Sequence, residues 1–143
     1  MHIDKKKILI WTIILIIIDL LSKHLIYNLW YLNSNYFITP ILNTGISWWI
    51  TLFHFNLLII MIPLILAGIY YMYKHNEINS LAFILIFSWW TANFIDRLIN
   101  HWVRDFINFH FFPIFNIADI FITIGFIILF FNVIMPPSDY KKQ

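Results

Sequence analysis

The chain has 143 residues, of which 62% are hydrophobic, 11% are charged and none is cysteine, and its formal net charge is +2. Because soluble domains have about one quarter charged residues, this composition excludes an ordinary soluble domain and indicates a membrane protein. The lack of cysteine excludes disulfides, thiol nucleophiles and thiolate metal sites.

Four apolar stretches predict four membrane-spanning helices, at residues 8–27, 53–73, 81–99 and 114–134. Each has about 20 residues, which at about 1.5 Å per residue is enough to cross roughly 30 Å of hydrocarbon. These spans use most of the chain. We therefore expect an all-α protein with a single membrane-embedded domain over residues 1–143 and no separate soluble domain.

The positions of the lysines predict the orientation. Lysines precede the first span, separate the second from the third, and end the chain (Lys5, Lys6, Lys7, Lys74, Lys141 and Lys142). The segment 28–52 has no Lys or Arg, so the positive-inside rule predicts cytoplasmic termini. We expect the first span to be a retained anchor, because no small-x-small cleavage site follows it.

The outer segment at residues 30–51 mixes aromatic residues with Asn, Thr and Pro. Alternating bulky residues in "YFITPIL" predict a short extended stretch, and Asn43, Thr44 and Gly45 predict a turn. The tryptophans of this segment suit the boundary between water and lipid. We expect a small β-like cradle on the outer face; a plain connecting loop with an aromatic belt is the alternative.

A second outer segment, "NHWVRDFINFHFFP" at residues 100–113, is too apolar for a solvated loop although it contains Arg104 and Asp105. This composition predicts a segment that lies in the membrane interface. Pro113 is predicted in the first turn of the fourth helix, where proline is favoured.

The pattern Asn-x-x-Asp occurs twice, as Asn93 to Asp96 in the third span and as Asn116 to Asp119 in the fourth. A spacing of three places the amide and the carboxylate on the same face of a helix, and Arg97 shares the face of Asn93. The third helix is predicted to run outward and the fourth inward. Both Asp residues are therefore expected at similar depth, near the outer boundary.

A charge in hydrocarbon needs a partner or a wet cavity. Asp19 and Lys23, four residues apart in the first span, are predicted to form a structural ion pair. Asp96 could be neutralised by Arg97 or Arg104, whereas Asp119 has no basic residue within one helical turn.

Two carboxylates held together in a site of low dielectric constant hold one proton between them. An aspartic peptidase uses such a pair: one Asp takes a proton from the attacking water and the other polarises the scissile carbonyl. A proton or cation relay in a small transporter or channel and a purely structural network are the alternatives. The nearly apolar inner halves of the helices disfavour a relay. The metalloprotease motif H-E-x-x-H is absent, so no metal is predicted.

Five short blocks in chain order resemble the lipoprotein signal peptidase (signal peptidase II) family of bacteria. They are "DLLSK" at 19–23, "NTG" at 43–45, "NFIDR" at 93–97, "VRDF" at 103–106 and "FPIFNIAD" at 112–119. The resemblance implies an aspartic endopeptidase of the bacterial cytoplasmic (inner) membrane. It would remove signal peptides from diacylglyceryl-modified prolipoproteins, cleaving before the lipidated cysteine near the outer leaflet.

The resemblance also implies roles for individual residues. Asp96 and Asp119 match the catalytic pair, and Asp19 with Lys23 matches a structural pair. The supporting, substrate-positioning residues are Asn43, Gly45, Asn93, Arg97 and Asn116. No cofactor, metal or nucleic acid is implied; the partners are the prolipoprotein substrates and membrane lipid, and we expect a monomer. The chain departs from the family where small residues usually precede Asn93, because Ser88, Trp89, Trp90 and Ala92 stand there.

Overall fold

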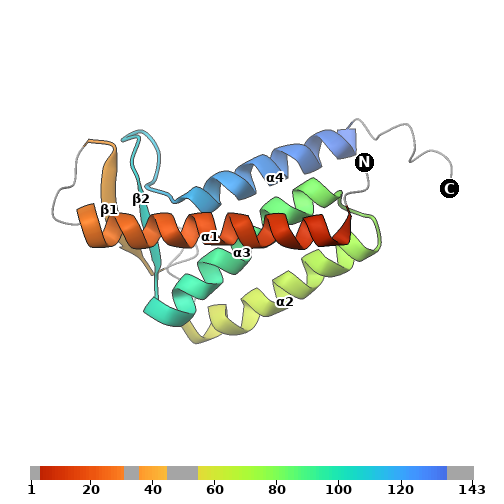
Figure 1. The fold of residues 1–143 in the computed structure, drawn as a ribbon, viewed down its shortest axis with the longest axis horizontal. Helices are drawn as coiled ribbons and strands as arrows, with labels where there is room; N and C mark the ends of the chain where they lie inside the picture. The colour runs from red at the N-terminus through yellow and green to blue at the C-terminus, as the bar shows by residue number, and fades with distance from the viewer. Residues whose placement is uncertain (1–3, 31–35, 45–54, 135–143) are drawn as a thin grey trace.

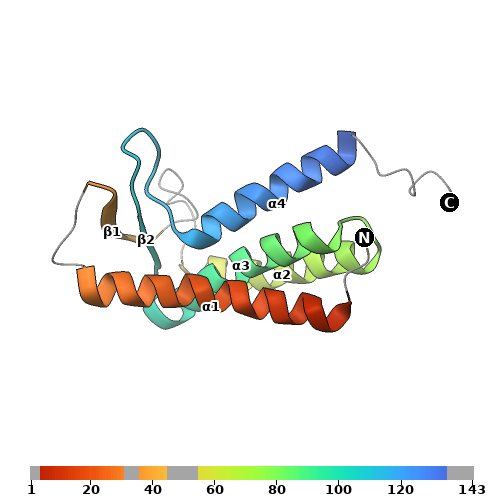
Figure 2. The same ribbon diagram turned by 45° about the horizontal axis from the view of Figure 1, so that its top comes forward.

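The computed structural model describes residues 4–30, 36–44 and 55–134, which form four helices and two strands (Figure 1). In chain order these are α1 (Lys5–Trp30), β1 (Ile38–Asn43), α2 (Phe55–Lys74), α3 (Ser80–Asn100), β2 (Val103–Ile107) and α4 (Ile117–Ile134). Helices α1 and α3 run toward the end of the bundle that carries the strands, and α2 and α4 run away from it. Figure 2 shows α4 inclined to the other helices, which it approaches near the strands.

Each of the four predicted spans falls on one of these helices. Three helical segments among the described residues are long and apolar enough to cross a membrane, at Lys5–Leu29, Leu57–Lys74 and Ser80–Asn100. The apolar part of α4, Ile117–Asn132, is shorter. The chain is therefore a helical membrane protein with three candidate spans and a small sheet, and the fourth crossing stays a prediction.

Local capping fixes the ends of α3. The side chain of Asn79 accepts a hydrogen bond of 2.8 Å from the backbone N–H of Ala82, which satisfies one of the free donors in the first turn. At the other end His101 adopts a left-handed conformation with φ of 70°, and its N–H donates to the carbonyl of Arg97. This helix therefore ends just before β2, and the chain turns back toward the bundle at His101.

The fourth helix begins at Ile117, so the prediction that Pro113 lies in its first turn is wrong. The cause is a short pairing before the helix: Phe115 and Ile107 form an isolated antiparallel bridge, with N–H to O distances of 2.8 and 3.1 Å. Asn116 then caps the helix. Phe115 thus extends the sheet region, and Pro113 lies before this bridge, outside the helix.

The two strands form an antiparallel pair in which Ile41 lies opposite Asp105 and Asn43 opposite Val103. The predicted extended stretch at 36–42 is thus confirmed from Ile38 onward. The register is irregular between Ile38 and Ile41, around Pro40, which has no N–H to donate. Strand β2 was not predicted: residues 100–113 were expected to be only an interfacial segment, and the partner of β2 lies far upstream in the chain.

The strand pair is attached to the helices by Tyr27 near the end of α1. Its hydroxyl donates to the carbonyl of Ile41 in β1 and lies 3.3 Å from the carbonyl of Asp105 in β2. One side chain of α1 therefore contacts both strands and fixes the sheet at this end of the bundle. Gly45 and the tryptophans predicted for the outer boundary at positions 48 and 49 lie outside the described residues.

Large apolar side chains cover the outside of the helices; Leu9, Leu64 and Phe130 are each more than 60% exposed. Between α3 and α4 the contact is tight, because a Cβ added at Gly125 would lie 2.7 Å from Cγ1 of Ile86. Near the sheet the interior is instead polar, and the buried residues there include charged ones. Such a polar interior inside an apolar exterior suits a protein surrounded by lipid, where buried charges are expensive unless they are paired or functional.

Candidate active site

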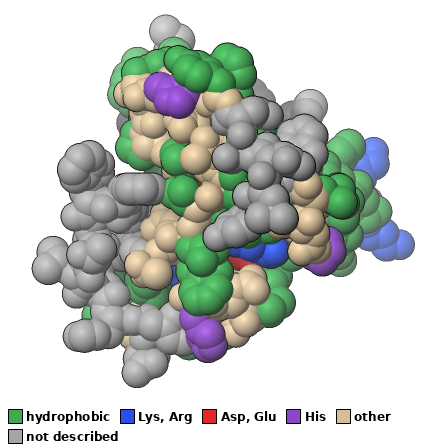
Figure 3. All heavy atoms as spheres, turned by 90° about the vertical axis from the view of Figure 1, so that its left-hand side faces the viewer, with side chains coloured by type: hydrophobic (Ala, Val, Ile, Leu, Met, Phe, Trp, Pro, Cys, Tyr) green, Lys and Arg blue, Asp and Glu red, His purple; other side chains and the backbone are tan. Residues whose placement is uncertain are grey.

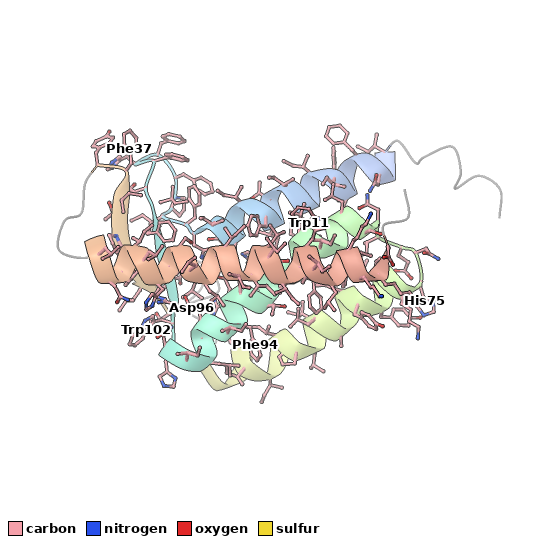
Figure 4. All side chains as sticks on the ribbon, viewed as in Figure 1. Trp11, Phe37, His75, Phe94, Asp96 and Trp102 are labelled. Atoms are coloured by element: carbon pink, nitrogen blue, oxygen red, sulfur yellow. The ribbon has the colours of Figure 1, made fainter. Side chains whose placement is uncertain are left out.

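The end of the bundle that carries the sheet encloses a cluster of buried polar side chains from α1, α3, β2 and the start of α4. The charged or amide side chains that are at most 7% exposed are Asp19, Lys23, Asn93, Asp96, Arg97, Asp105 and Asn116. Figure 4 shows Asp96 at this end of the molecule and His75 at the opposite end. Every charge in the cluster therefore needs a partner within it or contact with substrate and water.

The predicted ion pair within α1 is present. Nζ of Lys23 lies 2.6 Å from Oδ2 of Asp19, and both side chains are fully buried. The other oxygen of Asp19 accepts a hydrogen bond of 2.8 Å from the backbone N–H of Ala118 in the first turn of α4. Lys23 also donates to Oδ1 of Asn93 at 2.7 Å, so this pair joins α1 to both α3 and α4.

Asp96 is held by a set of cationic and amide donors. The backbone N–H, Nε and Nη2 of Arg104 lie 2.8, 2.9 and 2.6 Å from its oxygens. Asn100 donates to it at 2.8 Å, and Nζ of Lys23 lies 3.7 Å away. Arg104, one of the two residues predicted to neutralise Asp96, thus forms an ion pair with it. These donors attach the end of α3 to the first residues of β2.

The second Asn-x-x-Asp motif forms a capping box at the start of α4. The N–H of Asp119 donates to Oδ1 of Asn116 at 3.1 Å, and the N–H of Asn116 donates to Oδ2 of Asp119 at 2.9 Å. A spacing of three is what this reciprocal pair requires. The carboxylate of Asp119 thus lies at the positive end of the α4 dipole, where a negative charge is favoured.

Asp105 of β2 is the carboxylate that lies next to this cap. Its Oδ1 accepts a hydrogen bond of 2.6 Å from Nδ2 of Asn116, and its Oδ2 accepts one of 2.9 Å from Nδ2 of Asn43 in β1. Asn116 therefore contacts both Asp105 and Asp119. Burial above all, and then the negative charge of Asp119, raise the pKa of Asp105 to about 7, although the two amide hydrogen bonds oppose this shift.

The structure brings together most of the residues predicted for the site. Asn93 accepts from both Lys23 and Asn116, at 2.7 and 3.3 Å, and Nη1 of Arg97 lies 3.3 Å from the carbonyl of Asn93. Asn43 reaches the site through Asp105. Gly45 lies outside the described residues, so its role stays a prediction.

The predicted partnership of Asp96 with Asp119 has no counterpart among the hydrogen bonds and ion pairs of residues 4–30, 36–44 and 55–134. In these residues Asp119 is coupled to Asp105 through Asn116, and Asp96 is coupled to Arg104. Asp105 was not among the residues predicted for the site. Two signals could have identified it: a carboxylate in a segment too apolar for a loop, and its place in the block "VRDF".

Asp119 differs from the other acids in its exposure. It is only partly buried, whereas Asp19, Asp96 and Asp105 are at most 2% exposed. Seen from the sheet end, acidic atoms reach the surface as a small spot beside basic atoms, with hydrophobic and histidine side chains nearby (Figure 3). Within the part of the chain that the structure describes, no group of three or more His, Asp or Glu side chains is arranged to hold a metal ion.

The fold and the site together define a helical membrane protein with an acidic centre at one end of its bundle. The signal peptidase (SPase) II family matches residues 11–135. The lipoprotein signal peptidase of Bacillus pumilus (strain SAFR-032) is 33% identical and is aligned over 91% of this chain and 94% of its own length. That of Staphylococcus haemolyticus (strain JCSC1435) is 32% identical over 94% of both chains.

Solved structures agree with this match. A bacterial membrane enzyme determined by the in meso method at 2.3 Å resolution superposes with a TM-score of 0.81, at 27% identity, over 97% of this chain and 94% of its own. A second, at 1.9 Å resolution, gives a TM-score of 0.77 at 26% identity, over 93% of this chain and 96% of its own. The chain belongs to the signal peptidase II family and is a membrane protease that removes signal peptides. The transporter alternative is not supported.

Proposed function

We propose that this protein is an aspartic endopeptidase of the bacterial inner membrane that cleaves prolipoproteins before the diacylglyceryl-modified cysteine. The relatives' name, lipoprotein signal peptidase, supports the substrate class. The four-span topology with cytoplasmic termini and a site near the outer leaflet is part of this proposal. A monomeric enzyme is likewise part of this proposal.

The proposed catalytic pair is Asp105 with Asp119. The observation that carries this assignment is the position of Asn116 between the two acids. Its side-chain Nδ2 donates to Asp105, and its backbone N–H donates to Asp119. Two carboxyl groups coupled in this way share one proton between them. The pair of Asp96 with Asp119, which the sequence predicted, stays a prediction; the four donor contacts on Asp96 from Arg104 and Asn100 favour a structural role instead.

The two acids differ in ways that suggest their order of protonation. Asp119 is partly exposed and lies at a helix N-terminus, and both features favour its ionised form. Asp105 is 2% exposed, and its raised pKa of about 7 favours the protonated form at neutral pH. Asp119 is therefore assigned as the base and Asp105 as the acid.

In the first step Asp119 removes a proton from a water molecule, whose oxygen attacks the carbonyl carbon of the scissile peptide bond. Asp105 gives its proton to the carbonyl oxygen, so that a neutral gem-diol forms. In the second step a proton passes from Asp119 to the peptide nitrogen and the C–N bond breaks. One diol hydroxyl returns its proton to Asp105, which leaves a carboxyl group on the signal peptide and a free amine on the cysteine.

The experiment that tests this proposal is a cleavage assay with purified enzyme in detergent and a diacylglyceryl-modified prolipoprotein. Wild-type enzyme is expected to release the signal peptide, and the same prolipoprotein without its diacylglyceryl group should be left uncut. Asp119→Asn keeps an oxygen that can accept the capping hydrogen bond from Asn116 but removes the carboxylate base. This variant should lower the cleavage rate by about 10²–10⁴-fold. Full activity of Asp119→Asn would contradict the mechanism, and absence of cleavage by wild-type enzyme would contradict the substrate.

A further inference from the structure

Trp89 makes a direct contact with the proposed catalytic pair. It lies on α3, one turn before Asn93, and its Nε1 donates a hydrogen bond of 2.6 Å to Oδ1 of Asp119. A hydrogen bond this short is typical of a charged acceptor. The ring of Trp90 packs edge-on against that of Trp89, with centroids 4.4 Å apart.

This contact completes the set of donors around Asp119. Its Oδ1 accepts from Trp89 and its Oδ2 accepts from the backbone N–H of Asn116 at 2.9 Å. Indole and backbone N–H groups are donors only, so neither can accept a hydrogen bond from a protonated carboxyl group. Each oxygen keeps a second lone pair that can bind a proton, but protonation would remove the negative charge from the acceptor and weaken these hydrogen bonds. The two donors therefore favour the ionised form of Asp119. The two donors also bind opposite oxygens, which restrains rotation of the carboxylate.

We propose that Trp89 is a positioning residue for the reaction: its N–H keeps Asp119 ionised and in one orientation, and thereby leaves the shared proton on Asp105. This inference rests on the proposed function, because it needs Asp119 to act as the base. It assigns to Trp89 a role in chemistry through Asp119, beyond its packing between α3 and α4.

The matched variants are Trp89→Phe and Trp90→Phe. Each replaces an indole by a smaller ring on the same helix, but only the first removes the donor to Asp119. In Trp89→Phe the acid limb of the pH–kcat profile should move up by about one pH unit, since a hydrogen bond to a charged acceptor favours the ionised form roughly tenfold. KM should change less than kcat, and Trp90→Phe should keep the wild-type profile.

Other titratable groups near Asp119 contribute to the same profile. Asp19 of α1, Arg97 of α3 and Asp105 of β2 interact with its charge. Lys23, Asp96 and Arg104 form the ion pairs of the same cluster. All of them are present in both variants, so they cannot produce a difference between Trp89→Phe and Trp90→Phe. The pH at which the acid limb falls also does not depend on the folded fraction of each preparation. The folded fraction changes only the height of the profile.

A second measurement uses wild-type enzyme labelled with ¹⁵N in its indole groups and needs neither activity nor a Trp89 variant. One indole N–H resonance should depend on pH, and this dependence should vanish in Asp119→Asn. Identical pH profiles for the two Phe variants, or no indole resonance that depends on Asp119, would overturn the inference. If wild-type enzyme cleaves and these tests fail, only the role of Trp89 is wrong; if wild-type enzyme does not cleave, the proposed function itself fails.

Discussion

Replacing Asp96 and Asp105 in turn by Asn separates a structural carboxylate from a catalytic one. Both side chains are at most 2% exposed, and both substitutions keep the size of the group. Their partners differ: Asp96 binds the cationic groups of Arg104 and lies 3.7 Å from Nζ of Lys23. The carboxylate of Asp105 instead accepts hydrogen bonds from the neutral side-chain amides of Asn43 and Asn116. The two variants should therefore fail in different ways.

In Asp96→Asn the guanidinium of Arg104 loses its carboxylate partner, and Lys23 keeps Asp19 but loses the second carboxylate at 3.7 Å. Breaking a buried ion pair by removing one partner costs about 3–5 kcal/mol. We expect a loss of this size in the free energy of unfolding, with a cleavage rate per folded molecule within tenfold of wild type. In Asp105→Asn we expect the opposite: a rate per folded molecule lower by about 10²–10⁴-fold and little loss of stability.

The assay combines cleavage of a diacylglyceryl prolipoprotein with denaturant unfolding in the same detergent, so that each rate is divided by the folded fraction. Wild-type enzyme and Asp119→Asn, which removes the proposed base, bracket the range of activity. A folded Asp105→Asn enzyme with the wild-type rate, together with an inactive Asp96→Asn enzyme, would refute our assignment and support the pair predicted from the sequence.

Three further predictions concern stability. Asp19→Asn should lower the free energy of unfolding by about 3–5 kcal/mol, because Lys23 then loses its nearest carboxylate at 2.6 Å, and should change cleavage per folded molecule far less. Abolished turnover at unchanged thermal midpoint would contradict this. Gly125→Ala should destabilise by about 1–3 kcal/mol, because its Cβ would lie 2.7 Å from Ile86, whereas the control Gly68→Ala, with no atom within 4 Å, should be neutral or stabilising in thermal melts. The pKa of Asp105 rises from 3.8 to about 7 on folding, so between these pH values the folded state binds a proton that the unfolded state does not. The free energy of unfolding should therefore fall as pH rises through this window. In Asp105→Asn this decline should be smaller, and an equal decline would exclude Asp105 as its source.

Much of the fold could be predicted from local sequence. The apolar stretches marked all four helices, because a helix satisfies its backbone hydrogen bonds within itself and needs no distant partner. The ion pair of Asp19 with Lys23 was predicted for the same reason, since residues four apart are neighbours on one helix. Extended backbone around Ile38 was likewise visible as an alternation of bulky residues.

The sequence alone did not reveal which carboxylates meet. The two Asn-x-x-Asp motifs look alike in sequence, yet one sits within α3 beside Arg104 and the other caps α4. Strand β2 obtains its hydrogen bonds from a strand about 60 residues upstream, so no local pattern could place Asp105 between Asn43 and Asn116. The helices were fixed by interactions within a few residues. The link from Asp105 to Asp119 through Asn116 depends instead on the pairing of β2 with the distant β1 and on the bridge from Ile107 to Phe115.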